Sequence, residues 1–406
     1  MTAALPGRGA PSAWRTTLSA LCATLVGIGL ARFAYTPLIP ALIAARWFDP
    51  AQAVYLGAAN LAGYLAGALL APSMAARAAA ATILRVMMAL ATVAFFACAF
   101  PLSFSWFFVW RFAAGLAGGA LMALAAPTVL PHVPASRRGL AGGAIFTGVG
   151  LGIAASGTLV PLLLRRGLVE TWWGLGAFSL ALTALAWGGW PAAAIAPQAA
   201  PQARLEWVSG ASGPVKALYA EYALNAFGLV PHMVFLVDFI ARGLGHGIDS
   251  GTRYWVLFGL GAMVGPMLAG ALADRIGFRP ALRLALGIQA AAVLIPAFST
   301  GPGALGASSL ITGAFVPGIV PLVLGRMHEL IPVGGSARQA AWSGATTAFA
   351  LGQATGAYGL SFLFARAGGY DRLFELGAAA IVFALLIDLI ADRDGSGTIR
   401  APARSS

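Results

Sequence analysis

Apolar blocks alternate with short polar segments along almost the whole chain. A helix of about 20 apolar residues is long enough to cross a hydrocarbon core of about 30 Å. The pattern therefore predicts an all-α membrane protein with about twelve transmembrane helices in two halves of six. The predicted spans are residues 16–45, 51–71, 79–100, 105–130, 140–164 and 172–190 in the first half, and 217–240, 254–273, 281–298, 303–325, 340–364 and 373–390 in the second.

A segment rich in Pro, Ala and Gln separates the sixth and seventh predicted spans. It contains Pro197, Pro201, Arg204 and Glu206, a composition typical of a loop. The sequence thus predicts five parts, which are a tail at 1–15, a six-helix half at 16–190, an interhalf loop at 191–214, a second six-helix half at 215–391 and a tail at 392–406.

The basic residues are distributed unevenly among the predicted loops. With the N-terminus inside the cell, the inner loops and tails carry more than twice as many Lys and Arg residues as the outer loops. Cytoplasmic loops of membrane proteins collect Lys and Arg in this way. We therefore expect a multi-pass protein of the bacterial inner membrane, with both termini and the interhalf loop in the cytoplasm.

Composition narrows the function classes. The chain is 59% hydrophobic and 9% charged, whereas soluble domains carry roughly a quarter charged residues. The net charge of +12 is scattered between apolar blocks, so we do not expect nucleic-acid binding. The four His residues are spread singly, and no phosphate-binding Gly-x-x-x-x-Gly-Lys loop occurs. We accordingly expect no catalytic residues, no metal and no cofactor, and we predict that the protein is not an enzyme.

One loop carries a specific motif. The sequence Gly270-Ala-Leu-Ala-Asp274-Arg275-Ile-Gly277-Phe-Arg279 follows the eighth predicted span. It resembles the Gly-x-x-x-Asp-Arg-x-Gly-x-Arg loop signature of the major facilitator superfamily. The resemblance implies that these residues act in gating, at the cytoplasmic end of the bundle. The equivalent stretch after the second span, residues 67–77, has no acidic residue and so departs from the pattern.

Two further segments support the same resemblance. In the fourth span, Arg111, Gly115 and Gly119 are similar to the Arg-x-x-x-Gly-x-x-x-Gly pattern of that superfamily. The first span, residues 29–40, is similar to the YbfB/YjiJ-type branch of bacterial transporters. The resemblance extends over residues 16–390 and implies the two-half fold and a transport role, without a substrate.

Two arginines lie inside predicted spans of the first half. Arg32 is about 16 residues into its span and hence near the membrane midplane. A guanidinium there is costly unless it faces a wet cavity or a partner. Arg32 and Arg111 have no acidic residue inside the same half, so an anionic solute could supply the missing charge. The alternative for Arg32 is a structural bond to backbone carbonyls at the Pro37 kink.

Other polar residues within spans are secondary candidates for substrate binding or coupling. They are Tyr35, Asn60, Tyr64, Asn225, His232 and Gln353. His232 can be a packing residue or a proton relay, and Pro231 beside it is expected to break the helix. Glu221 and Asp238 lie near the ends of the seventh span, so we expect both to be solvated.

The sequence therefore predicts a secondary active transporter that moves a small solute by alternating access, as a monomer in the lipid bilayer. A channel is disfavoured because there is no repeated filter segment and no charge ring. Two functions stay open, and for both the resemblance to the superfamily implies proton coupling. One is a carrier of an organic anion, suggested by Arg32 and Arg111. The other is a proton-antiport exporter of drugs or metabolites, implied by the fifth span, which resembles the antiporter-type motif of the superfamily except that Val149 replaces its usual Pro.

Overall fold

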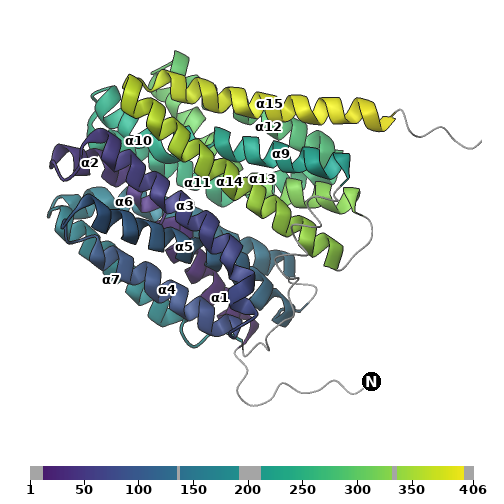
Figure 1. The fold of residues 1–406 in the computed structure, drawn as a ribbon, viewed down its shortest axis with the longest axis horizontal. Helices are drawn as coiled ribbons and strands as arrows, with labels where there is room; N and C mark the ends of the chain where they lie inside the picture. The colour runs from purple at the N-terminus through teal and green to yellow at the C-terminus, as the bar shows by residue number, and fades with distance from the viewer. Residues whose placement is uncertain (1–11, 135–137, 192–211, 332–335, 397–406) are drawn as a thin grey trace, which may run out of the picture.

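The computed structural model describes residues 12–134, 138–191, 212–331 and 336–396, and every regular element within these ranges is helical. The interhalf loop and both tails predicted from the sequence lie mostly outside the described residues. Figure 1 shows two groups of helices side by side, one purple to blue and one green to yellow. The first group contains α1 (Ala13–Thr24), α2 (Ile39–Ala44), α3 (Pro50–Ala75), α4 (Ala80–Ala97), α5 (Phe104–Val129), α6 (Arg138–Leu164) and α7 (Leu168–Ala186). The second contains α9 (Gly213–Gly228), α10 (Leu236–Asp238), α11 (Gly247–Ile276), α12 (Phe278–Phe298), α13 (Pro302–Leu330), α14 (Ser336–Ala367) and α15 (Asp371–Ser396).

The all-α membrane fold is confirmed. In the described part of the chain, eleven helices are long and apolar enough to cross a membrane, and each overlaps one of the predicted spans. The span predicted at 340–364 corresponds to α14, which is not among those eleven. The mean hydropathy of α14 is too low because polar residues interrupt its apolar sequence, namely Ser343, Thr346, Thr347 and Gln353. It nevertheless packs inside the bundle against α3 and α9.

The first helix of each half is interrupted in its second part. After α1 the chain forms a π-helical segment, Leu25–Leu30, and a 3₁₀ segment, Phe33–Leu38, before α2. After α9 it forms π-helical segments at Pro231–Phe235 and Phe239–Gly243. Pro37 and Pro231 lack the N–H that a regular helix needs, and π segments are common at functional sites. The spans predicted at 16–45 and 217–240 are confirmed as Ala13–Ala44 and Gly213–Gly243, and within them the regular α-helix is interrupted near Pro37 and, as expected, at Pro231.

Glycines hold two helix pairs in close contact, one pair in each half. A Cβ atom on Gly63 or Gly115 would collide with backbone atoms across the α3–α5 contact. The same holds for Gly261 and Gly313 across the α11–α13 contact. Small residues allow backbones in membranes to approach closely, so these pairs act as rigid units within their halves.

The two halves contact each other at the end of the bundle away from the start of α1. There α6 packs on α11, and α3 packs on α14. The Thr36 hydroxyl donates to the Met233 carbonyl at 2.5 Å, and Trp255 Nε1 donates to Ser156 Oγ at 3.1 Å. These bonds join the halves and close that end of the bundle.

Gly115→Ala should lower the thermal unfolding temperature of the purified protein, because its Cβ would meet the Asn60 carbonyl oxygen in the α3 backbone. Overpacking a close contact costs about 1–3 kcal/mol. Gly287→Ala in α12 is the matched control, since a Cβ there meets nothing within 4 Å, and Ala is the better helix former. Thermal unfolding of both variants in the same detergent measures the difference. Equal unfolding temperatures would show that the α3–α5 contact does not require glycine at position 115.

Candidate functional site

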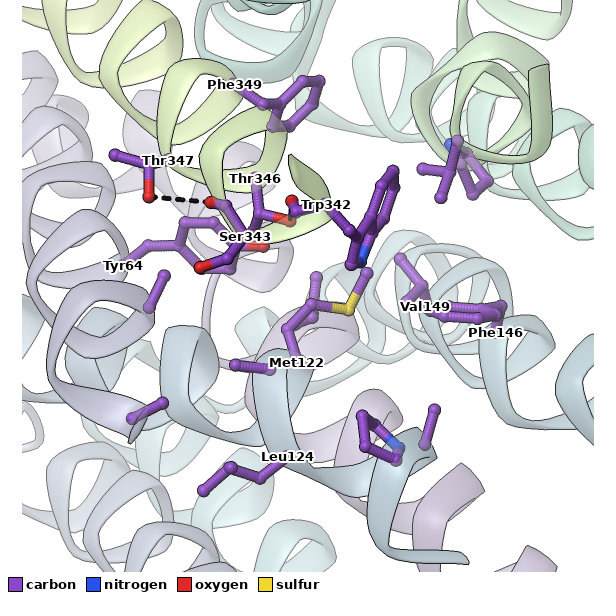
Figure 2. A pocket seen from close by; sticks show the side chains of 18 of the residues that line it. Tyr64, Met122, Leu124, Phe146, Val149, Trp342, Ser343, Thr346, Thr347 and Phe349 are labelled. Atoms are coloured by element: carbon purple, nitrogen blue, oxygen red, sulfur yellow. Dashed lines mark hydrogen bonds between the residues drawn. The ribbon is translucent and has the colours of Figure 1, made fainter. Parts of the chain in front are cut away.

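A cavity of about 380 Å³ lies between the two halves. That volume falls within the range of small-molecule sites, which is about 300–1,000 Å³. Figure 2 shows labelled side chains from both halves surrounding it, with Tyr64 and Met122 on one side and Trp342 and Phe349 on the other. The remaining labelled lining residues are Leu124, Phe146, Val149, Ser343, Thr346 and Thr347.

The cavity lies toward the end of the bundle where α1 starts. Pro72, Pro127 and Leu130 line it close to the ends of α3 and α5, and Trp342 lines it close to the start of α14. Arg32 and Phe33 line it at the opposite, inner limit. Beyond them Phe33 contacts Trp255 and Phe258, with ring centroids 5.9 and 6.5 Å apart. The cavity thus ends in the middle of the bundle, where the halves close.

Most of the cavity wall is apolar or aromatic, with a few polar groups on α14. Thr346 and Thr347 donate their hydroxyls to the carbonyls of Trp342 and Ser343 at 2.9 Å. Their oxygen atoms can still accept a hydrogen bond from a ligand. The wall therefore suits a largely apolar molecule with a small number of polar groups.

Arg32 carries the only charge among the residues that line this cavity in the described chain. Its guanidinium lies 4.9 Å from the ring centroid of Phe33 and 5.2 Å from that of Tyr64. One terminal nitrogen contacts Met233 Sδ at 3.7 Å, and Nε is buried without a hydrogen-bond partner. Arg32 forms no ion pair with a described residue, so its charge is stabilised only by aromatic faces and a weak sulfur acceptor.

Gln353 approaches the same sulfur atom from the other half. Its Nε2 atom contacts Met233 Sδ at 3.7 Å, and its Oε1 atom has no partner. Two donors, one from each half, therefore converge on one weak acceptor at the inner limit of the cavity. A carboxylate oxygen would be a much stronger acceptor for both donors than the thioether.

Arg111, Asn60 and Tyr35 lie behind this site and do not line the main cavity. Arg111 donates to the Ala31 carbonyl at 2.8 Å, and Asn60 Nδ2 contacts the same oxygen at 3.4 Å. The Tyr35 ring lies 4.2 Å below the Arg111 guanidinium, and the Tyr35 hydroxyl donates to the Ala53 carbonyl at 2.8 Å. These three residues hold the chain at the junction between α1 and its 3₁₀ continuation.

Asn225 and His232 lie inside the second half, away from the main cavity. Asn225 Nδ2 contacts Gln289 Oε1 at 2.6 Å. His232 is fully buried, with Nε2 2.7 Å from Ser308 Oγ and its ring edge-on to Phe374. Of the eight binding or coupling candidates, the structure brings Arg32, Tyr64 and Gln353 to the main cavity.

The motif predicted to act in gating forms the end of α11 and the turn into α12. Gly277 has a φ of +88°, which favours glycine, and it ends α11. Gly270 lies one turn before Asp274, and a Cβ on Gly270 would meet nothing within 4 Å. Asp274 and Arg275 are exposed, and neither forms an ion pair with a described residue. Arg279 instead binds Asp388 of α15, with Nε at 3.3 Å from Oδ1.

Glu221 and Asp238 are buried, so the expectation that both are solvated is wrong. Asp238 accepts from Arg242 at 2.5 and 2.6 Å and from the Tyr370 hydroxyl at 2.7 Å. This network connects the C-terminal end of the broken first helix of the second half to the start of α15. Glu221 has no such partners, and its Oε2 atom is buried without a hydrogen bond.

Comparison with known proteins places this architecture in a family. A family model described as "Uncharacterised MFS-type transporter YbfB" matches residues 24–389. The chain belongs to this family of MFS-type transporters. It is therefore a secondary transporter of a small solute, which confirms the resemblance seen in the motifs.

Structural comparison agrees on the fold. The chain is similar to a crystal structure entitled D-xylose-proton symporter, with a TM-score of 0.70 and 15% sequence identity, over 92% of this chain and 97% of that one. At that identity the likeness shows the MFS fold alone. No curated protein matches the sequence.

Sequence reasoning missed most of the aromatic wall of this MFS transporter. Phe33, Tyr222, Trp342 and Phe349 line the cavity and are indistinguishable in sequence from lipid-facing aromatic residues. The polar residues on α14 could have been found, because Ser343, Thr346, Thr347 and Gln353 recur on an otherwise apolar span.

Arg111→Met and Arg32→Met should change stability differently. Arg111→Met removes the 2.8 Å donor to the buried Ala31 carbonyl, which should cost about 1–3 kcal/mol and lower the unfolding temperature. Arg32→Met removes a guanidinium that donates no hydrogen bond to any oxygen of the described residues, so the unfolding temperature should be unchanged or raised. Thermal unfolding of the two variants and the parent in the same detergent checks the contrast. The reverse order would mean that Arg32 is the structural arginine.

Proposed function

We propose that the protein is an alternating-access carrier of a small organic anion, coupled to protons, which works as a monomer in the bacterial inner membrane. The observation that carries this proposal is the pair of donors from Arg32 and Gln353 that converge on Met233 Sδ, each at 3.7 Å. One of them is a cation without a carboxylate partner. A carboxylate that displaced the sulfur would neutralise Arg32 and bond to both halves at once.

The shape and chemistry of the cavity support a monocarboxylate with an apolar body as the anion. The cavity volume of about 380 Å³ suits a small molecule, and Arg32 supplies its single charge. Phe146, Phe349, Trp342 and Tyr222 offer aromatic surface to the rest of the ligand. The α14 hydroxyls can accept a bond from a hydroxyl or amide on that ligand.

The arrangement of the two ends supports alternating access. The contacts α6–α11 and α3–α14 close the end away from the start of α1, while the cavity lies toward the other end. With the N-terminus in the cytoplasm, this conformation is inward-facing. Asp274 and Arg275 are exposed and form no ion pair with a described residue, which fits a gating contact that is broken in this state.

An exporter of drugs or metabolites by proton antiport is the second candidate. It is favoured by the predominantly apolar and aromatic cavity wall, which would also suit a lipophilic ligand. An unpaired guanidinium at the inner limit would repel a lipophilic cation. Uptake into vesicles of labelled monocarboxylates, compared with labelled lipophilic cations, separates the two functions.

Arg32→Lys should weaken monocarboxylate binding while the protein still folds. Lysine keeps the charge but lacks the planar fork that bonds both oxygens of a carboxylate. Losing one charge-assisted bond costs about 1.5–3 kcal/mol, or roughly 10- to 150-fold in affinity. Equilibrium binding of the best labelled monocarboxylate to purified protein measures this change.

Arg85→Lys is the matched control for that experiment. Arg85 also contacts an aromatic ring and donates to a backbone carbonyl, with Nε 2.8 Å from the Trp187 oxygen, but it lies away from the cavity. Its affinity should equal that of the parent. If a well-folded Arg32→Lys variant binds as tightly as Arg85→Lys, the anion site is not at Arg32.

A cysteine placed at Ser343 should react only from the cytoplasmic side. Ser343 lines the cavity near the start of α14, and the native Cys22 and Cys98 are buried. A membrane-impermeant thiol reagent should therefore label Ser343→Cys in inverted vesicles and leave it unlabelled in intact cells. Labelling in intact cells that equals labelling in inverted vesicles would reverse the proposed orientation.

A further inference from the structure

Three carboxylates are buried in the described part of the chain, and one of them differs from the others. Asp238 is bonded to Arg242 and Tyr370, and Asp388 is bonded to Arg279 and Arg283. Glu221 is 3% exposed, its Oε2 atom has no hydrogen-bond partner, and it forms no ion pair with a described residue. A buried carboxylate without a partner is the costliest state for this group.

The location of Glu221 is inside the second half, not at its surface. It lies eight residues after Gly213, the first residue of α9, and so about 12 Å along the helix axis. The adjacent Tyr222 lines the main cavity and packs on Phe349 of α14, with ring centroids 4.5 Å apart and ring planes tilted by 39°. Glu221 therefore lies on a helix that borders the cavity, although its own side chain does not line the cavity.

The charged groups around Glu221 come from three neighbouring helices. They are Asp388 of α15, Arg279 and Arg283 of α12, and Arg326 of α13. Asp388 binds the two α12 arginines, and Arg326 donates to Glu329 at 2.8 Å. In the part of α14 whose side chains are described, residues 341–367, the only charged residue is Arg366, at the end of the helix far from Glu221. Each neighbouring cation thus already has a carboxylate, and Glu221 is the acid that is left over.

We propose that Glu221 is the proton-binding site of this transporter and carries the coupling proton together with the anion. This inference rests on the function proposed above. In the inward-facing conformation Glu221 is held as the neutral acid, with the proton on one carboxyl oxygen. On release that O–H bond breaks, the proton passes to water, and the electron pair stays on the carboxylate. Uptake is the reverse step, and no other reactant is needed.

The helix that carries Glu221 leads directly into the segment that forms the proposed anion site. α9 continues into the π-helical segment Pro231–Phe235, which carries Met233, the sulfur contacted by Arg32 and Gln353. The charges near Glu221 include Arg279, a residue of the loop motif predicted to act in gating. A movement of α9 against α12 and α15 would therefore change both the charges around Glu221 and the position of Met233.

The charges give a definite stoichiometric expectation. One monocarboxylate at Arg32 and one proton at Glu221 together carry no net charge, so a membrane potential should not drive their transport. A pH gradient of one unit should support accumulation of up to about tenfold, because one unit of pH is worth a factor of ten in an equilibrium.

Glu221→Gln should separate transport from the proton gradient. The amide mimics the neutral acid but cannot release a proton. In proteoliposomes, exchange of labelled benzoate for unlabelled benzoate should persist. The initial rate of accumulation driven by one pH unit, measured above the diffusion of benzoic acid into protein-free liposomes, should fall to zero. Glu375→Gln is the matched control, since Glu375 is an exposed carboxylate on α15, and it should accumulate benzoate as the parent does. Accumulation by Glu221→Gln equal to that of Glu375→Gln would overturn the proposal.

A second measurement needs no substrate and so separates this proposal from the anion-carrier function. Infrared spectra of the purified parent near neutral pH should contain the carbonyl band of a protonated carboxylic acid. That band should be lost in Glu221→Gln and kept in Glu375→Gln. Glu221→Gln should also unfold at the parent's temperature, because it replaces a neutral group by a neutral group. A retained band, or a large drop in unfolding temperature at neutral pH, would overturn the proposal even if benzoate proved not to be a substrate.

Discussion

The carbonyl of Ala31 is the acceptor on which the geometry of the cavity depends. It lies where the first helix changes from a π-helical to a 3₁₀ segment, in a bilayer that offers no water to an unsatisfied backbone group. Arg111 and Asn60 reach it from two other helices of the same half. This fixed junction directs the next residue, Arg32, into the cavity, where its own charge is left without an oxygen acceptor.

The second half also has a broken first helix, but here the break places a residue at the contact between the two halves. Its first helix also breaks, at Pro231, and the break brings Met233 to the interface, where its carbonyl accepts from Thr36 and its sulfur contacts Arg32. Breaks in both first helices thus meet at the closed end of the cavity. Because π-helical and 3₁₀ turns give the backbone an alternative hydrogen-bond register, this is the region where binding of a ligand can alter the contact between halves.

The sequence predicted the fold well and the site only in part. Span length and the positions of Arg and Lys depend on local composition, so the helices could be placed within a few residues. The roles of Arg32 and Arg111 could not be separated in this way, since both are single arginines in apolar spans. Only the packing of three helices shows that Arg111 faces a carbonyl and Arg32 a cavity. Glu221 was expected to be solvated because it lies near a helix end, but α9 packs against α14 and α15, and Glu221 is buried.

Charge pairing distinguishes residues that stabilise this protein from residues that are available for function. The buried carboxylates of Asp238 and Asp388 each have an arginine, so they contribute to holding helices together within the second half. Arg32 and Arg111 in the first half and Glu221 in the second form no ion pair among the described residues. Arg111 donates to the Ala31 carbonyl, whereas neither Arg32 nor Glu221 has an oxygen or nitrogen partner among the described residues. Leaving an ionisable group unpaired in a low-dielectric interior is unfavourable for folding. In the carrier proposed above, an anion bound at Arg32 and a proton bound at Glu221 would complete these two charges, one in each half of the protein.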